Sequence, residues 1–507
     1  MIRDNEFDRQ LLDQVMPEDA PEPRVSGRYN LVVIGAGTAG LVAAAGAAGL
    51  GARVALIERA AMGGDCLNTG CVPSKSLLKS AHAAADMRRA SELGIHIDGS
   101  VRVDFAAVMN RMRRIRSQIA RNDSVARFRD DLGVDVFLDE GRFIGKQLIE
   151  VGDQELSFSR AVIATGARAR VPEIPGLAES GYLTNDTIFD LEVLPENLII
   201  LGGGPIGCEL AQAFCRLGSK VTLLEAEGQF LGREDADAAQ VLWERLREDG
   251  VDVRLSTRLE QIEPGSDSNH QARLRAEGSE TETLPFDQIL IAAGRAPNVQ
   301  GLGLEEAGIR FSETRGVEIN DQFQTSNARV YAIGDVAMDF KFTHAADAAA
   351  RAVVQNALFS VAGVGQKTLS SLTIPWCTYT DPEIAHVGLT LQEAKEQGKE
   401  IETYRCDLAD VDRAITDGRE EGFVKVHVKK GGDRILGATV VSPHAGELIN
   451  EISVAMAGGM GLGALAGIIH PYPTLAMAIR ETGNAYTRTR LTPTVARLFD
   501  RILEWRR

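Results

Sequence analysis

The feature that most constrains the fold is a strand–glycine–helix–strand unit that occurs twice in the chain. The first copy begins with the apolar strand Tyr29–Ile34 and continues through Gly35, Gly37 and Gly40 into an alanine-rich helix and a second strand that ends at Glu58. The three glycines permit a tight turn, a close approach of the backbone to a pyrophosphate, and close packing of helix on strand. The N–H groups at the helix N-terminus favour phosphate, and the acid can hold ribose hydroxyls.

The second copy begins with the strand Asn197–Leu201 and ends at Glu225. Its loop contains three glycines in the same spacing: Gly202, Gly204 and Gly207. Two such units predict two doubly wound nucleotide-binding modules in an α/β fold.

The bulk composition fits an intracellular globular protein of several domains. The chain has 507 residues, and at roughly 100–200 residues per domain this suggests about three domains. Its formal net charge of −16 gives it no general electrostatic attraction to nucleic acid. It contains no apolar run of ~18 residues, and its N-terminus is acidic without an apolar signal core, so we expect a cytoplasmic protein.

Cys66 and Cys71 form a close pair in the segment GGDCLNTGCVPSK, just before a helix expected to begin near Pro73. A zinc site usually needs four ligands, commonly as two C-x2-C pairs, and the chain has no such second pair, so we assign no metal ligands. Two buried inert cysteines are the simpler alternative, but they would not need the surrounding glycines. We favour a redox-active dithiol, because a helix N-terminus lowers the pKa of a nearby thiol. Cys71 is then the stabilised thiolate, and Cys66 is the thiol that attacks the substrate.

This segment resembles the active-site signature of the class I pyridine nucleotide-disulfide oxidoreductases, and the similarity covers about residues 29–485. The resemblance implies that FAD binds the first glycine loop, against the cysteine pair, and that a nicotinamide nucleotide binds the second. Glu225 would repel a 2′-phosphate and Arg233 is the only early arginine nearby, so we expect NADH, with NADPH as the alternative. By the same resemblance, Lys75 lies near the flavin and pairs with Glu209 beside the nicotinamide.

Other short segments also match the family in order and spacing. They resemble two strand-end crossings between domains and a turn whose acid binds the flavin ribitol. Together they complete the predicted cofactor-binding set, which consists of Gly64, Thr165, Gly166, Gly294, Arg295, Gly334 and Asp335, with Asn298 in the second crossing.

The branch of the family is indicated by the stretch HPYPTLAM. In the dihydrolipoamide and glutathione branches, an H-P-T-x-x-E motif places an acid/base histidine in the partner subunit's active site. Here Tyr472 stands at the histidine position and Met477 at the glutamate position. His470 is offset by two residues, and we favour a structural role for it. A tyrosine at this place resembles mercuric reductase, although the chain has no cysteine after Cys406 and none in residues 1–27.

We therefore predict a mercuric-reductase-like homodimer with a shared active site, in which NADH, FAD and the cysteine pair reduce a disulfide or a soft metal. The alternatives are a dihydrolipoamide dehydrogenase that works without the histidine, and a flavin-bearing redox sensor without turnover. The predicted architecture is two doubly wound domains, for FAD and NAD, with an α+β C-terminal dimerisation domain. Its boundaries are an N-terminal extension 1–27, a FAD domain 28–180 and 300–369, an NAD(P)H domain 181–299, a dimerisation domain 370–485 and a basic tail 486–507.

The basic tail carries arginines among apolar residues and is expected to end in a short amphipathic helix. We favour packing of this helix on the protein or on the partner subunit over contact with an anionic membrane surface.

Overall fold

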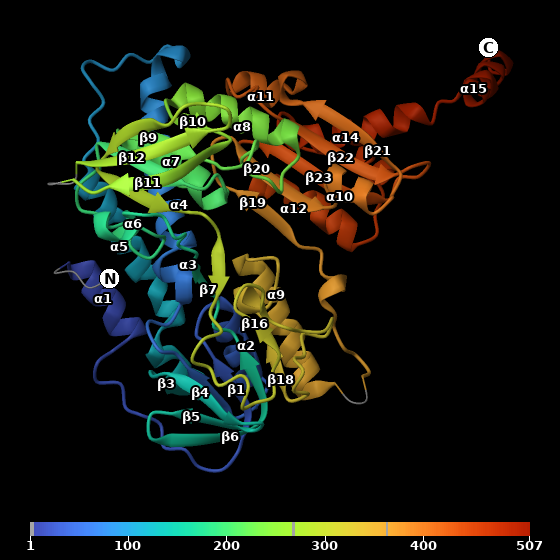
Figure 1. Cartoon of the computed structure of the whole chain (residues 1–507). Coiled ribbons are helices and arrows are strands. Elements are labelled where there is room, and N and C mark those ends of the chain that lie inside the picture. Colours follow the sequence, from blue (N-terminus) through green and yellow to red (C-terminus); the bar gives the residue numbers. More distant parts are fainter. Residues whose placement is uncertain (1–4, 266–268, 361–362) are drawn as a thin grey trace. The chain divides into compact units, whose positions relative to one another are not determined.

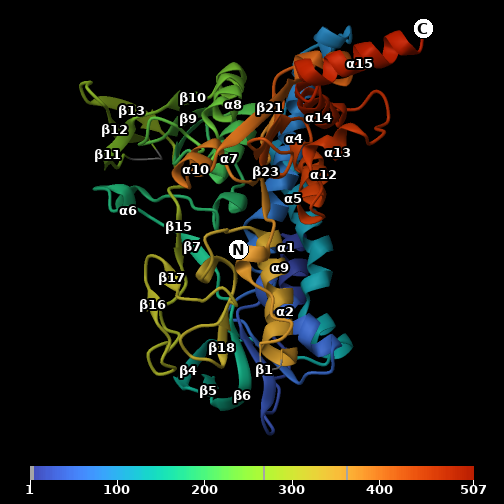
Figure 2. The same ribbon diagram turned by 90° about the vertical axis from the view of Figure 1, so that its right-hand side faces the viewer.

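The computed structural model describes residues 5–265, 269–360 and 363–507. The chain divides into two compact units, each of which is assembled from several segments (Figures 1 and 2). The first unit comprises Met1–Gly202, Ala213–Leu224 and Thr257–Leu372, and the second comprises Gly203–Gln212, Glu225–Ser256 and Thr373–Arg507.

The main sheet of the first unit is built around β1 (Tyr29–Ile34), which pairs in parallel with β2 (Val54–Ile57) and β6 (Gln154–Ile163). Parallel pairing continues from β2 to β3 (Asp135–Phe137) and from β6 to β18 (Val330–Ala332). Parallel strands are covered on both faces, which explains why β1 and β2 are almost continuously apolar. On β6, an antiparallel ribbon adds β5 (Leu148–Val151) and β4 (Gly141–Gly145).

In the first unit, the N-termini of three helices, α2 (Thr38–Gly49), α4 (Cys71–Arg89) and α9 (Thr343–Val354), lie close to the cysteine pair. The helix α2 packs on α9. Only alanine, glycine, valine and leucine follow Thr38 in α2, so the two helices can approach closely. The short helix α3 (Gly64–Asn68) is followed by α4, and both pack on α5 (Phe105–Ala120).

Two helices differ from the sequence prediction. The helix expected near Pro73 begins two residues earlier, at Cys71. Proline is tolerated there because the N–H groups of a first helical turn have no intrahelical partner. In the extension, where a helix was not foreseen, α1 (Glu6–Val15) begins after Asn5, whose side chain accepts a hydrogen bond from the N–H of Phe7.

The remainder of the first unit carries the strands of the second glycine motif. There β8 (Asn197–Leu201) pairs in parallel with β9 (Lys220–Leu224) and β14 (Gln288–Ile291). An antiparallel sheet contains β11 (Thr257–Glu263), β12 (His270–Ala276) and β13 (Glu282–Phe286). A two-stranded ribbon contains β7 (Ala167–Ala169) and β15 (Arg295–Pro297).

The second unit is centred on an antiparallel sheet of five strands. In spatial order these are β19 (Pro375–Thr378), β20 (Glu383–Gly388), β23 (Ile435–Ser442), β22 (Phe423–Lys429) and β21 (Ile401–Asp407). Three helices pack on the sheet: α8 (Ala236–Asp249), α12 (Ala445–Ala457) and α14 (Met477–Thr489). Apolar side chains of strands β20 to β23 and of α12 and α14 form its core.

Further helices and strands complete the two units. They are α6 (Leu177–Ser180), α7 (Pro205–Leu217), α10 (Leu391–Glu396), α11 (Asp412–Thr416), α13 (Leu462–Ala466), β10 (Asp252–Arg254), β16 (Phe311–Ser312) and β17 (Gly316–Val317).

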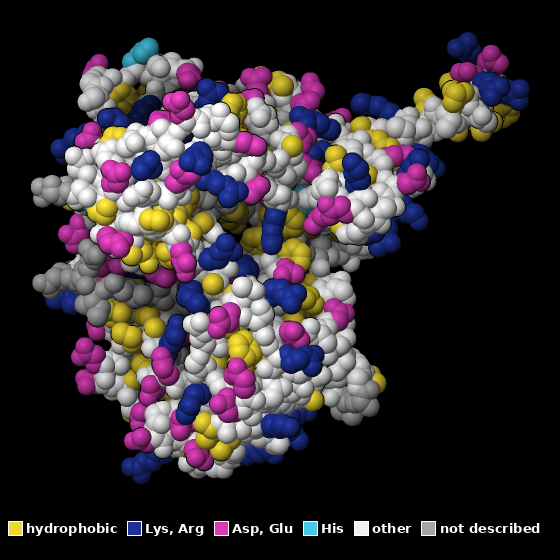
Figure 3. Space-filling model, in the orientation of Figure 1, with side chains coloured by type: hydrophobic (Ala, Val, Ile, Leu, Met, Phe, Trp, Pro, Cys, Tyr) yellow, Lys and Arg dark blue, Asp and Glu magenta, His cyan; other side chains and the backbone are white. Residues whose placement is uncertain are grey.

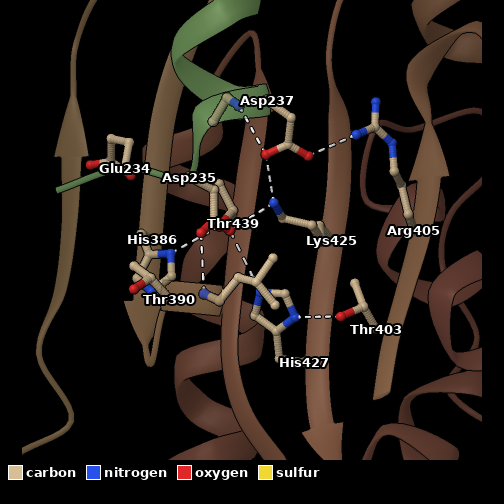
Figure 4. A network of polar contacts seen from close by, with 12 residues as sticks. Glu234, Asp235, Asp237, His386, Thr390, Thr403, Arg405, Lys425, His427 and Thr439 are labelled. Carbon is tan, nitrogen blue, oxygen red and sulfur yellow. Dashed lines mark hydrogen bonds and ion pairs between the residues drawn. The ribbon is translucent and has the colours of Figure 1, made fainter. Parts of the chain in front are cut away.

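A buried polar network holds the N-terminus of α8 on this sheet (Figure 4). The Lys425 ammonium on β22 lies 2.7 Å from a carboxylate oxygen of Asp235 and 2.6 Å from one of Asp237. Arg405 on β21 also contacts Asp237, at 2.9 Å. Because a buried charge without its partner is strongly destabilising, these ion pairs restrict α8 to one position on the sheet.

The chain ends in α15 (Pro493–Trp505), the amphipathic helix expected from the sequence, and none of its residues is buried. It extends away from α14 in Figures 1 and 2, and Figure 3 shows hydrophobic and basic side chains together on it. Within the described part of the chain, we find no helix with the length and apolar character that a membrane crossing requires.

Candidate active site

The first glycine loop has the shape of a dinucleotide site. Gly35 has a left-handed backbone with φ of 102°, and a Cβ there would collide with the carbonyl oxygen of Ala164. A Cβ on Gly40 would collide with the carbonyl oxygen of Gly35. A Cβ on Gly37 would meet nothing nearer than the Cα of Gly64, at 3.8 Å. The first and third glycines are therefore required by the protein's own packing, whereas the second leaves open space for a ligand.

Glu58 fixes this loop from the end of β2. One carboxylate oxygen accepts the N–H of Ala36 at 2.6 Å, and the other accepts the N–H of Ala60 at 2.9 Å. Burial raises the pKa of Glu58, and these two N–H groups partly offset that rise. The loop, the acid and the N-terminus of α2 fit the pyrophosphate and ribose of FAD.

Glu225 repeats the same arrangement at the second glycine loop. Its carboxylate accepts the N–H of Gly203 at 2.8 Å and the N–H of Glu227 at 3.0 Å. Gly202 has a left-handed backbone with φ of 113°, and a Cβ on Gly204 would meet no atom within 4 Å. The loop thus combines a tight turn, open space and a carboxylate, as a nucleotide site requires.

The cysteine pair lies where three helices begin. Cys71 is the first residue of α4, and its Sγ lies 3.3 Å from the hydroxyl of Thr343, the first residue of α9. Cys66, in α3, interacts with Thr343 and with Thr38, the first residue of α2. Helix N-termini carry partial positive charge, so this convergence stabilises a thiolate on the pair.

Within the pair, Cys71 lies at the N-terminus of α4, where the helix dipole favours negative charge. The hydrogen bond and charge of Cys71, together with burial, raise the pKa of the Cys66 thiol, and the hydroxyls of Thr343 and Thr38 only partly offset this. The position of Cys71 at the start of α4 therefore makes its sulfur the better placed of the two for the charge. This supports the roles predicted from the sequence.

Arg295 connects the cysteine segment to the predicted flavin-ribitol acid. Its guanidinium contacts Asp65, the neighbour of Cys66, and lies 3.3 Å from a carboxylate oxygen of Asp335. Burial raises the pKa of Asp335, and Arg295 partly opposes this rise. Arg295 and Asp335 are among the predicted cofactor residues, whereas Asp65 is not, although that acid stands inside the segment GGDCLNTGCVPSK.

The two predicted strand-end crossings lie side by side. The hydroxyl of Thr165 donates to the carbonyl of Asn298 at 2.8 Å, and the Asn298 amide donates back to the carbonyl of Thr165 at 2.9 Å. The N–H of Asn298 donates to the carbonyl of Gly166 at 3.0 Å, and the carbonyl of Gly294 accepts the N–H of Arg170 at 2.9 Å. These hydrogen bonds thus join two segments that lie about 130 residues apart in the chain.

Lys75 and Glu209 belong to different units of the structure. Lys75 follows Cys71 by one turn of α4 in the first unit. Glu209 is buried in the second unit, where its carboxylate accepts the N–H of Tyr379 at 2.9 Å. Their pairing stays a prediction.

The position of the family's histidine is held by an exposed tyrosine. The Tyr472 hydroxyl donates to a carboxylate oxygen of Asp412 at 2.8 Å, and this hydrogen bond raises the pKa of Tyr472. His470 is buried, with its Nε2 at 2.8 Å from Glu451 and its Nδ1 at 3.1 Å from the carbonyl of Ile468. Both ring nitrogens of His470 are thus engaged, which favours a structural role. Asp412 was missed because it lies 60 residues from Tyr472 in the chain.

Comparison with known proteins defines the class. The family model described as pyridine nucleotide-disulphide oxidoreductase matches residues 29–352, and the dimerisation domain of the same family matches residues 374–482. The chain belongs to this family, which confirms the predicted fold class, FAD and a pyridine nucleotide as cofactors, and an enzyme that is a flavoprotein disulfide oxidoreductase. The dimerisation domain supports a homodimer.

The chain is similar to members of the family with different names. A mercuric reductase of Bacillus cereus is 33% identical over 89% of this chain and 70% of its own length. A dihydrolipoyl dehydrogenase of Thermus scotoductus is also 33% identical, over 90% of this chain and 97% of its own length. A solved structure of the HOCl-induced flavoprotein disulfide reductase RclA of Escherichia coli, as its Cu(II) complex, has a TM-score of 0.79 and 30% identity and covers 91% of this chain and 100% of its own.

Proposed function

We propose that the enzyme uses NADH to reduce a soft metal ion or a small disulfide through Cys66 and Cys71, as a mercuric-reductase-like member of its family. FAD, when bound at the first glycine loop, supplies the two-electron relay between the nicotinamide and the cysteine pair. Oxidation of the dithiol to a disulfide releases two electrons and two protons. Together they convert one disulfide into two thiols. With a metal acceptor the two electrons convert one Hg(II) into Hg(0) or two Cu(II) into two Cu(I), and the two protons are released to solvent.

The observation that carries the choice of acceptor is the Tyr472–Asp412 contact. Oxidation of a dithiol such as dihydrolipoamide requires a base that takes a proton from the incoming thiol, and a histidine with a pKa near ~6.5 does this at neutral pH. Tyrosine ordinarily titrates near ~10, and the Asp412 carboxylate raises the pKa of Tyr472 further. Tyr472 remains a hydrogen-bond donor that can orient a substrate, but it is a poor base. The names of the mercuric reductase and of the Cu(II)-binding RclA support a metal acceptor.

We propose the following roles for the remaining residues. Lys75 stabilises negative charge beside the flavin and pairs with Glu209 near the nicotinamide. Tyr472 of one subunit faces the cysteine pair of its partner in a homodimer. We also propose that the cofactor residues predicted from the sequence bind FAD and the nicotinamide nucleotide, and that the domains have the predicted boundaries.

The direct test is NADH consumption, without oxygen, with lipoamide, glutathione disulfide, Hg(II) and Cu(II) as acceptors. We expect turnover with at least one metal ion or with glutathione disulfide, and only a weak rate with lipoamide. Cys66→Ser and Cys71→Ser should each lose the activity with every acceptor. Cys377→Ser, which removes a half-buried cysteine of β19, is the matched control and should retain the rate. A lipoamide rate equal to the best other rate and flat from neutral to mildly alkaline pH would make the chain a dihydrolipoamide dehydrogenase. No turnover with any acceptor would instead favour the redox sensor.

A further inference from the structure

The N-terminal helix α1 lies outside the part of the chain that the family model matches, which begins at residue 29. It is nevertheless packed firmly on α5. Leu11 and Val15 are buried, and Asp8 is only 1% exposed. The amide of Asn5 donates to Asn110 on α5 at 2.9 Å, which fixes the start of the helix. A charged side chain at this depth needs a reason beyond covering apolar surface.

Asp8 is the counter-ion of two buried arginines of α5. Its carboxylate lies 2.7 Å from a guanidinium nitrogen of Arg116 and 3.5 Å from one of Arg113. The side chain of Arg116 is 1% exposed and that of Arg113 is 6% exposed. Without the carboxylate of Asp8, these two positive charges would face each other away from water.

The same guanidinium of Arg116 reaches the segment between the two cysteines. Its other terminal nitrogen donates to the backbone carbonyl of Asn68 at 2.7 Å. The Asn68 amide in turn donates to the carbonyls of Met62 and Gly64, each at 3.0 Å. The N–H of Met62 donates to the carbonyl of Val15, the last residue of α1, at 3.0 Å. The segment from Met62 to Asn68 is therefore bonded to α1 directly at Met62, and at Asn68 through Arg116.

We propose that α1 positions the redox-active cysteine pair, with Asp8 and Arg116 as positioning residues that act through the carbonyl of Asn68. This inference rests on the proposed dithiol function. A disulfide forms only within a narrow range of Cβ–Cβ distances, so the geometry of the turn between Cys66 and Cys71 contributes to the dithiol–disulfide equilibrium. Loss of the Asp8 charge weakens the hold of Arg116 on Asn68 and changes that equilibrium.

The test measures the equilibrium itself in the full-length, FAD-loaded protein. Wild type and Asp8→Asn are equilibrated in dithiothreitol redox buffers, and alkylation with mass spectrometry gives the oxidised fraction of the pair. We expect Asp8→Asn to shift the equilibrium constant at least about fivefold, which is about 20 mV for a two-electron couple. Hydrogen exchange of residues 62–70 should also become faster. Asp13→Asn, which removes an exposed acid of the same helix, is the matched control and should change neither. Asp8→Glu should restore most of both properties.

A purely structural helix would give a different result. Asp8→Asn would then melt at a lower temperature but keep the wild-type equilibrium and the wild-type exchange of residues 62–70, and the inference would be overturned. If Asp8→Asn does not fold, Arg116→Lys serves instead, because a lysine cannot bond Asp8 and Asn68 through a planar fork. No acceptor is needed, so failure of the acceptor panel leaves this result intact. A wild-type pair that never forms a disulfide would refute the proposed function together with the inference.

Discussion

At the scale of single residues, Cys66 and Cys71 have different surroundings and different proposed roles. Cys71 starts α4 and is hydrogen-bonded to the start of α9, whereas the pKa of Cys66 is raised by Cys71 and by burial. The two cysteines are therefore not equivalent, although the sequence places them in one short segment.

Substitution of each cysteine separately tests this division. Cys66→Ser should keep the Cys71 thiolate and show, without any reductant, the long-wavelength absorption of a thiolate next to oxidised flavin. Cys71→Ser should lack this absorption, because it removes the sulfur at the N-terminus of α4 and burial still raises the pKa of the remaining Cys66 thiol. Identical long-wavelength absorption in the two variants would show that the roles are assigned wrongly.

Glu225 should set the choice of nucleotide. Its carboxylate is fixed by two backbone N–H groups at the end of β9, where it would repel a 2′-phosphate. We expect kcat/KM for NADH to exceed that for NADPH by about tenfold or more, and Glu225→Gln to narrow the ratio several-fold because the repulsion is lost. The rate at saturating NADH serves as the control. Equal kcat/KM for both nucleotides in the wild type would contradict this, and Arg233 would then be the first residue to examine.

Local motifs made the residues of the glycine loops and of the cysteine pair predictable, because their spacing is set by turns within one short segment. Asp65, Arg116 and Asp412 were not predicted. Arg116 reaches Asn68 across 48 residues and Asp8 across 108, and no pattern within one sequence marks such a partner.

At the level of elements, the polar network between α8 and the sheet of the second unit contains two side chains whose pKa values are strongly shifted. Glu234, just before α8, accepts the indole N–H of Trp376 at 2.6 Å, and burial raises its pKa to about 7. His386 on β20 is also buried, and loss of hydration lowers its pKa to about 4. Burial thus favours the neutral form of both side chains.

The Glu234 carboxyl should make stability depend on pH. Between its ordinary value of 4.5 and about 7, the folded protein holds a proton that the unfolded chain releases, so stability falls as pH rises through this window. Glu234→Gln removes this dependence and should gain up to about 3 kcal/mol relative to wild type on going from pH 5 to pH 8. Melting temperatures of variant and wild type at both pH values follow this change in relative stability. Glu244→Gln, on the exposed face of α8, is the control and should show no such change. A difference between variant and wild type that is the same at both pH values would contradict it.

Strands were more predictable than helix ends. The apolar runs of β1 and β8 have the predicted bounds, since parallel strands buried on both faces leave a continuous apolar signal. The start of α4 was placed two residues late because Pro73 was taken as its first residue. In the extension, α1 was missed because the charged residue Asp8, which is buried, interrupts the pattern of its apolar face.

For the whole molecule, the dimerisation domain supports a homodimer, and the shared active site stays a proposal. Tyr472 of one subunit is proposed to serve the cysteine pair of the other. Such sharing predicts that two defective chains can complement each other.

Co-expression of Cys66→Ser and Tyr472→Ala chains tests this arrangement. A mixed dimer has one site with both defects and one intact site, so random pairing should restore about a quarter of the wild-type sites. Each variant alone provides the baseline. Activity of the mixture equal to the mean of the two variants would show that Tyr472 acts within its own subunit or not at all.

The central claim is that electrons from NADH reach Cys66 and Cys71. The most direct measurement is an anaerobic titration of the oxidised, FAD-loaded enzyme with NADH, followed by alkylation and mass spectrometry of every cysteine. The account predicts that two thiols per chain become newly alkylated, and that these are Cys66 and Cys71. If NADH reduces the flavin while no new thiol appears, or if the new thiols lie at other cysteines, the account is contradicted.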